Sequence, residues 1–178
     1  SRFSMTILFV TDKFPPEPTT VGNIVNTLAI ALSKLGHHVS VLTTYAHSRP
    51  LAGEIKTEKF GKVTVFRLPR WSPSGFLHTL LTLYNPFLVR DFDKIVAKVN
   101  PDIIHFHNIH QSLCFCLLSR AKKVAKGVFL TTHDVMLFTY GKLIGYTSYK
   151  VSLRDQLTKF KLTYNPFRNL AIKYYLSF

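Results

Sequence analysis

Residues 7–42 decide the fold of this chain: Ile7-Leu8-Phe9-Val10, then TDKFPPEPTTVGN at 11–23, then IVNTLAIALSKLGHHVSVL at 24–42. The unbroken apolar run predicts a strand buried on both faces. Apolar residues at helical spacing, followed by Gly36, predict an amphipathic helix over residues 21–35. A second strand is predicted over residues 39–43. The result is one βαβ unit whose first loop lies at the carboxyl end of its first strand, where open parallel sheets bind ligands.

Strands and helices continue to alternate outward from this unit. Strands are predicted near residues 6–11, 63–68, 103–106 and 128–132, and helices at 76–99 and 109–126. The first of these helices should break at Tyr84-Asn85-Pro86-Phe87, because Asn suits an N-cap and Pro suits the first helical position. The same tetrapeptide recurs at 164–167. Residues 45–61 are expected to be irregular and residues 72–75 a turn. The alternation predicts an α/β fold with a doubly wound, mostly parallel sheet.

Composition favours a single cytoplasmic domain. The chain has 178 residues, 47% of them hydrophobic, which suffices for one packed core. No apolar run reaches the length of a membrane span, and the first residues lack the apolar region of a signal peptide. The only cysteines are Cys114 and Cys116. Two positions apart in a predicted helix, they should point to different sides and remain reduced core residues.

The formal net charge of +14 suggests an anionic partner. Nucleic acid, a phosphorylated substrate and acidic lipid all fit. Beyond residue 138, basic residues greatly outnumber the single acid, Asp155, and the sequence becomes basic, aromatic and helical in pattern. The alternative is a solvated face whose acidic counterpart lies elsewhere in a longer protein, and the pattern at residue 178 suggests that this chain is a fragment of one.

Three candidate site segments should meet at the carboxyl edge of the sheet. They are the loop carrying Thr20, Gly22 and Asn23, the pair His107-Asn108 with His110, and the pair His133-Asp134. The loop offers helix N-terminal amides to an anion or to sugar hydroxyls, although simple N-capping by Thr19 or Thr20 explains it as well. No G-x-G-x-x-G and no Walker A motif is present, which argues against an oxidoreductase or P-loop site.

The histidines permit several interpretations. His133 could bind a hydroxyl or transfer a proton, or it could simply bond the backbone. His105 and His107 share one strand face and could suggest zinc, but no carboxylate or cysteine completes a ligand set, so no metal site is expected. His105 is predicted to pack within the sheet and His107 to lie at its rim.

Other charged residues have simpler explanations. Asp91 and Asp93 imitate an Asp-x-Asp metal motif, but two positions apart on a helix they should form a solvated face. Arg67, Arg70 and Trp71 could bind nucleic acid or membrane, and the apolar residues of 76–83 could lie in a membrane interface. An ordinary core-facing helix is the alternative.

Several of these motifs, in this order, resemble family 4 glycosyltransferases of the GT-B fold. They are FPPEPT at 14–19 with Gly22, the 28–43 segment with Gly36-His37, NPDIIHFHN at 100–108, and TTHD at 131–134. The resemblance is good from about Met5 to Asp134 and loose beyond. It implies that residues 1–178 form the Rossmann-like N-terminal, acceptor-side half of a GT-B enzyme. It also implies a C-terminal, donor-binding domain that is absent from this sequence.

The resemblance further implies the chemistry. A retaining hexosyltransferase would move a sugar from a nucleotide-sugar donor to a lipid-linked or saccharide acceptor, with no cofactor and no metal. Thr20, Gly22 and Asn23 would approach the donor phosphates or sugar. His133 would be catalytic, next to the transferred sugar, and His107, Asn108 and Asp134 would line the acceptor side. Many members carry Gly-Gly where this chain has Thr19-Thr20, so its backbone would approach the ligand differently.

We therefore expect a cytoplasmic glycosyltransferase domain, inactive alone, that lies peripherally on the inner face of the cell membrane through its basic surface. The alternative is a non-catalytic basic module that binds nucleic acid or an acidic polymer. The sequence contains no recognised nucleic-acid motif, so nucleic acid is the less favoured partner.

Overall fold

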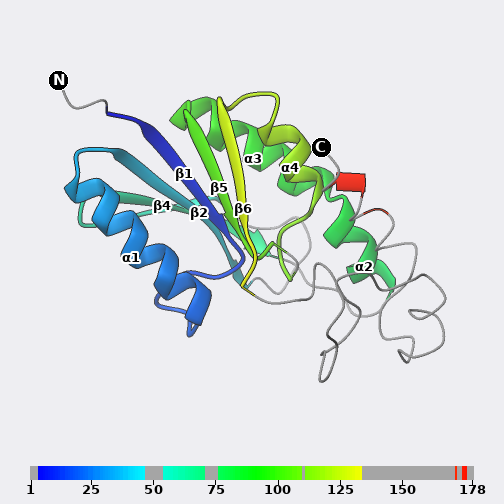
Figure 1. Ribbon diagram of the computed structural model, residues 1–178. Coiled ribbons are helices and arrows are strands. Elements are labelled where there is room, and N and C mark those ends of the chain that lie inside the picture. Colours follow the sequence, from blue (N-terminus) through cyan, green and yellow to red (C-terminus); the bar gives the residue numbers. More distant parts are fainter. Residues whose placement is uncertain are drawn as a thin grey trace, which may run out of the picture.

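A single mixed sheet forms the centre of the molecule (Figure 1). The computed structural model describes residues 4–46, 54–70, 76–109 and 111–133, together with Ala171, Tyr174 and Tyr175. The sheet order is β3-β4-β2-β1-β5-β6, and only β3 is antiparallel to its neighbour. The strands are β1 (Thr6–Thr11), β2 (His38–Ala46), β3 (Lys56–Phe60), β4 (Val63–Arg70), β5 (Ile103–His107) and β6 (Gly127–Thr131). The predicted mostly parallel sheet is confirmed.

Helices cover both faces of the sheet (Figure 1). They are α1 (Thr20–Lys34), α2 (Phe76–Leu83), α3 (Pro86–Val99) and α4 (Cys116–Ala121). On one face α1 packs Val25 and Ala29 against β1, β2 and β4. On the other face α3 and α4 bury a larger cluster that includes Phe92 and Leu117. The sheet is therefore doubly wound, as predicted. Within the described residues, no helix is long and apolar enough to cross a bilayer.

The helix boundaries follow the predicted capping signals. The Thr19 side chain accepts a hydrogen bond from the Gly22 amide at 3.1 Å, and Gly36, with φ of 98°, follows the end of α1. Asn85 caps α3 by accepting from the amides of Phe87 and Leu88, with Pro86 in the first turn. The α2–α3 break is thus confirmed.

Two predictions of local structure were wrong. Residues 45–61 are not wholly irregular, because β2 extends to Ala46 and KTEKF at 56–60 forms β3. This edge strand is charged and half exposed, so it lacks the apolar alternation that signals a strand. The predicted helix 109–126 contains only the short α4, because the Asp12 carboxylate binds the amides of residues 111–113 and holds them in a turn.

The shortened helix also changes the cysteine prediction. Cys114 precedes α4 while Cys116 begins it, so the two thiols do not diverge as they would on one helix. Their sulphur atoms lie 3.1 Å apart, and both are free and buried. The hydrogen bond with Cys116, together with burial, raises the pKa of Cys114 well above its ordinary value. The two thiols are core residues, but they form an adjacent pair.

The prediction of a solvated face is wrong for Asp91 but not for Asp93, whose side chain is 39% exposed. Asp91 is 8% exposed and lies 3.1 Å from Arg90 Nε and 3.4 Å from Lys94 Nζ. Asp93 pairs with Arg120, which fastens α3 to α4. Asp91 is therefore paired within its own helix, whereas Asp93 connects two helices.

Several predictions lie outside the described residues. These are the 72–75 turn, the second Tyr-Asn-Pro-Phe segment, the basic region beyond residue 138, Trp71, His110 and Asp134.

Candidate functional site

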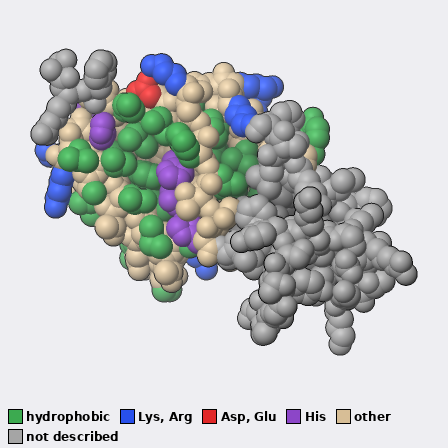
Figure 2. Space-filling model, viewed as in Figure 1, with side chains coloured by type: hydrophobic (Ala, Val, Ile, Leu, Met, Phe, Trp, Pro, Cys, Tyr) green, Lys and Arg blue, Asp and Glu red, His purple; other side chains and the backbone are tan. Residues whose placement is uncertain are grey.

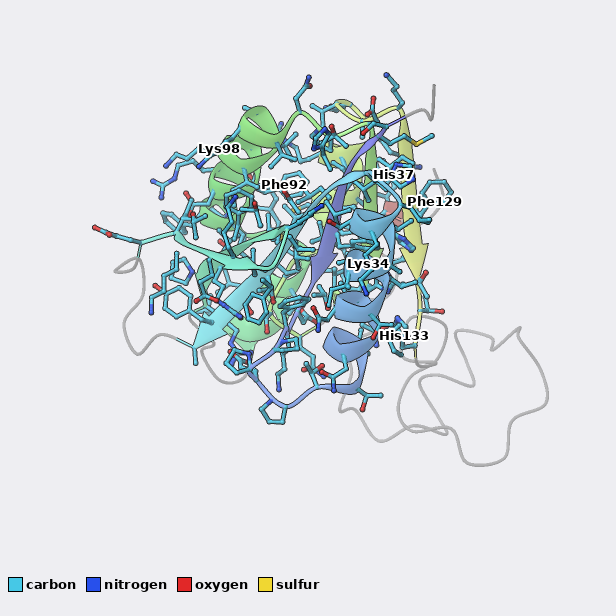
Figure 3. All side chains as sticks on the ribbon, turned by 90° about the vertical axis from the view of Figure 1, so that its left-hand side faces the viewer. Lys34, His37, Phe92, Lys98, Phe129 and His133 are labelled. Atoms are coloured by element: carbon cyan, nitrogen blue, oxygen red, sulfur yellow. The ribbon has the colours of Figure 1, made fainter. Side chains whose placement is uncertain are left out.

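The carboxyl ends of the parallel strands and the N-terminal end of α1 meet at one edge of the sheet (Figures 1 and 3). Strand register places Thr11 of β1 opposite His107 of β5, and His107 opposite Thr131 of β6. His133, labelled in Figure 3, follows β6 by two residues and lies toward this edge, whereas His37 lies toward the opposite one. The described residues of all three predicted segments, namely the first loop, His107-Asn108 and His133, thus share an edge.

The first loop is held in place by close packing at Gly22. This residue is buried, and a Cβ built there would lie 2.6 Å from the Lys13 carbonyl oxygen and 2.4 Å from the Thr19 side chain. No larger residue fits without movement, and the Gly22 amide is occupied by Thr19. The role that the structure gives Gly22 is therefore close helix–loop packing, and contact with a donor stays a prediction.

Thr20 and Asn23 remain accessible at the start of α1. Both residues are exposed. The Asn23 amide bonds the Thr19 carbonyl, as the first intrahelical bond of α1. The amides of Thr20 and Val21 precede the intrahelical ladder and face beyond the helix end. This end of α1 can favour an anion through these amides and the helix dipole.

Three histidines form a connected row along β5 and the end of β6. The ring centroids of His105 and His107 are 4.2 Å apart, and those of His107 and His133 are 5.2 Å apart. His107 Nδ1 lies 2.9 Å from His133 Nε2, and His105 Nε2 lies 2.8 Å from Thr131 Oγ1. Figure 2 shows histidine side chains grouped among apolar ones on the face of the molecule in view.

The burial of the row adds to one prediction, because His107 lies at the predicted rim, as the last residue of β5, but is enclosed there. His107 is only 1% exposed and packs against Phe9, whereas His105 is half-buried. The neighbouring strands β1 and β6 flank His107 on both sides. Burial, and next His105 and His133, lower the pKa of His107 from 6.5 to about 3. Burial and His133 also lower the pKa of His105. His107 is therefore neutral at physiological pH.

Asn108 ties the ends of two strands together. Its side-chain oxygen accepts the His133 backbone N–H at 2.9 Å, and its own N–H donates to the Thr131 carbonyl at 3.4 Å. Its φ of 42° is left-handed, which Asn tolerates better than most residues. Asn108 therefore braces the backbone that carries His133. The predicted acceptor-binding roles of Asn108 and His107 remain predictions, and both residues are less than 10% exposed.

Asp12 is an organising residue that the sequence reasoning missed. It follows β1 directly and is 5% exposed. One carboxylate oxygen accepts from the Gln111 amide at 2.9 Å, and the other from the Ser112 and Leu113 amides at 2.8 Å each. The signal in the sequence was an acid placed directly after a buried strand, where a carboxylate needs hydrogen-bond donors.

Arg67 does not contribute to a basic binding surface. It is 4% exposed, and its guanidinium donates to the carbonyls of Phe14 and Pro15 and pairs with Glu58. Arg70 donates to Ser112 Oγ at 2.7 Å. Arg67 braces the loop after β1, and Arg70 contacts the loop after β5. This corrects the interpretation of Arg67 as a nucleic-acid or membrane contact.

In the part of the chain that the structure describes, no three His, Cys, Asp or Glu side chains are grouped so as to hold a metal ion.

Comparison with known proteins assigns the family. The model of glycosyltransferase family 4 matches residues 21–171. The chain belongs to this family. The matched range contains α1 from its second residue onward, the histidine row and the β6 end, so the predicted resemblance is confirmed. The family match and the doubly wound sheet together identify a domain of this family that has a Rossmann-like architecture.

The relatives are distant and longer than this chain. An uncharacterised 42.6 kDa protein of the cps region of Klebsiella pneumoniae is 30% identical over 64% of this chain and 32% of its own length. A phosphatidylinositol N-acetylglucosaminyltransferase subunit from Arabidopsis thaliana is 29% identical over 74% of this chain and 28% of its own length. The chain thus spans about a third of these curated relatives.

Among solved structures, the catalytic domain of starch synthase IV from Arabidopsis thaliana, bound to ADP and acarbose, is similar in fold. Its TM-score is 0.46 at 16% identity, over 75% of this chain and 35% of that one.

Proposed function

We propose that this chain is the acceptor-side domain of a retaining glycosyltransferase that moves a hexose from a nucleotide sugar to a lipid-linked or saccharide acceptor. The observation that carries the proposal is the shared edge: the start of α1 and His133 lie where the parallel strands end. That edge is where open α/β sheets bind ligands. A donor-binding domain would lie in the remainder of the whole protein, since the matched segment is only about a third of each curated relative.

The residues of this edge suit the transfer step. The bond between the anomeric carbon and the diphosphate oxygen would break, and the acceptor hydroxyl oxygen would bond to that carbon on the same face. The hydroxyl proton would pass to the departing diphosphate oxygen, which gains the electron pair of the broken bond. The outward amides of Thr20 and Val21, with the α1 dipole, would stabilise negative charge on the diphosphate. His133 would hydrogen-bond the transferred sugar, and Asn23 would border the donor.

The test is a transfer assay with the full-length protein. Radiolabelled nucleotide sugars are supplied with lipid and polysaccharide acceptors, and product anomeric configuration is read by NMR. We expect retention of configuration, and a loss of about 100-fold or more in kcat/KM for His133→Ala. The control is His38→Ala, which alters an exposed histidine at the opposite edge of the sheet. Equal losses in the two variants would contradict the proposed site.

We also propose that the protein works at the cytoplasmic face of an anionic membrane. The net charge of +14 supports this, because acidic lipid attracts basic protein surface. Co-sedimentation should be stronger with anionic than with neutral vesicles and should weaken with salt. Equal recovery with both vesicle types would count against membrane binding. A salt-dependent gel shift of nucleic acid, with no sugar transfer in the assay above, would favour the alternative, a non-catalytic basic binding module.

A further inference from the structure

The contact between His107 and His133 has two proton arrangements. The two nitrogens are 2.9 Å apart, the ring centroids are 5.2 Å apart, and the ring planes are inclined by 24°. The centroid separation exceeds the nitrogen separation by about two ring radii, so both nitrogens lie near the line that joins the rings. Ring N–H bonds and lone pairs point along that line, so this geometry is an in-plane hydrogen bond. In two neutral rings, either His107 Nδ1 donates to His133 Nε2, or His133 Nε2 donates to His107 Nδ1.

The burial of His107 distinguishes these arrangements. If His133 donated, the proton of His107 would reside on Nε2. That atom is buried and has no hydrogen-bond partner among the described residues. A buried N–H without an acceptor is rare in proteins, and it is rarer than a buried acceptor without a full set of donors. If His107 donates through Nδ1, its buried Nε2 is an acceptor without a donor. This state costs less free energy than a buried N–H without an acceptor.

The surroundings keep both rings in this relation. His107 lies between the rings of His105, at 4.2 Å, and Phe9, at 5.6 Å. His105 is itself bonded to Thr131, and the His133 backbone is bonded to Asn108. The low pKa of His107, about 3, keeps this ring neutral at physiological pH. The titratable groups that face it are His105 on its own strand and His133 beyond β6.

We propose that His107 is a positioning residue that donates its Nδ1–H to His133 Nε2 and so holds the proton of neutral His133 on Nδ1. This inference rests on the proposed function only in taking the ligand of His133 to be a sugar. With Nε2 occupied, Nδ1–H is the group of the His133 ring that remains for a ligand. His133 therefore acts as a hydrogen-bond donor to an oxygen of the transferred sugar, and its Nε2 does not accept the acceptor's proton. In this arrangement His107 orients His133 and fixes its tautomer, and it does not line the acceptor site.

The test is a nitrogen-15 NMR spectrum of the chain with labelled histidine, at neutral pH and without any sugar. We expect His133 Nε2 to give the signal of an unprotonated nitrogen and His133 Nδ1 that of a protonated one. We also expect a scalar coupling across the hydrogen bond between His107 Nδ1 and His133 Nε2. A protonated His133 Nε2 in the unaltered chain would overturn the proposal outright.

Two variants at position 107 separate the hydrogen bond from packing. His107→Asn places an amide donor near the Nδ1 position, so His133 should keep its proton on Nδ1. His107→Phe keeps a ring of similar size but donates nothing, so His133 should shift toward the Nε2–H form. An unchanged His133 tautomer in a folded His107→Phe chain would also overturn the proposal. Should His107→Phe fail to fold, the unaltered chain and His107→Asn still decide.

The outcome is independent of whether the transfer assay succeeds. The expected spectrum combined with no detectable transfer would refute the proposed function and leave the proton arrangement standing. A contrary spectrum combined with retaining transfer would refute this inference alone.

Discussion

At the scale of single residues, Gly22 shows how one position can be required for structure before any ligand is considered. A glycine near the start of a helix suggests an anion-binding site. In this chain Gly22 instead allows the helix to lie against the Lys13 carbonyl, where a side chain would clash. The absence of a side chain is what allows α1 to start so close to β1. The position of Thr20 and Asn23 at the edge of the sheet depends on this contact.

Gly22→Ala should lower the free energy of unfolding by about 1–2 kcal/mol. Overpacking costs about 1–3 kcal/mol, and the better helix propensity of alanine returns up to about 1 kcal/mol. Urea denaturation followed by circular dichroism measures the change. Asn23→Ala, an exposed substitution in the same turn, should stay within about 0.5 kcal/mol. A Gly22→Ala chain as stable as the parent would contradict the packing role.

His107 should make the chain sensitive to acid. Its pKa is about 3 in the folded chain and near 6.5 when unfolded, so protonation favours the unfolded state. Its contribution is fully present above pH 6.5 and is lost as the pH falls toward 3. Between pH 6.5 and 5 the loss is about 2 kcal/mol. Urea midpoints should therefore fall less steeply with acid in His107→Phe than in the parent or in His38→Gln. Parallel profiles would refute this.

At the scale of elements, the loop between β5 and α4 is set by a residue far away in the sequence. Helical periodicity over residues 109–126 favours a long helix, yet three consecutive amides of that segment bind the Asp12 carboxylate instead. Hydrogen bonds to a charged, buried group are stronger than the weak helix propensity of a single turn. The capping of α3 by Asn85 was predictable because every group involved lies within four residues.

Asp12→Asn should loosen this loop and cost at least about 2 kcal/mol of stability. The asparagine side chain carries no charge. Its NH₂ group would also face backbone N–H donors at a position where a carboxylate oxygen accepts their hydrogen bonds in the parent chain. Hydrogen exchange at residues 111–113 should become faster, and the urea midpoint should fall. Asp93→Asn is the matched control, because its partly exposed ion pair with Arg120 is worth at most about 1 kcal/mol. Unchanged exchange at residues 111–113 would show that Asp12 does not hold the loop.

At the scale of the whole molecule, the sheet brings distant segments to one edge. The parallel pairing of β1 with β5 and of β5 with β6 places the ends of three strands together. Arg67 joins the first loop to β4, and Asp12 joins β1 to the loop after β5. These contacts hold the loops at this edge in fixed positions. Substitutions of Arg67 or Asp12 should therefore change the site by moving its loops, without removing a residue that would contact the ligand.

The order of residues was enough to predict the parallel α/β architecture, five of the six described strands, the α1 and α3 caps and the family. Those features depend on apolar runs and on capping groups that lie within a few residues of each other. The folded chain was needed to show that β3 completes the sheet, that Asp12 ends a helical pattern, that Arg67 is internal and that His107 lies behind His133. Each of these features depends on a contact partner that is distant in the sequence. That partner determines the free energy of burying a charge or a ring, and a local stretch of sequence does not reveal it.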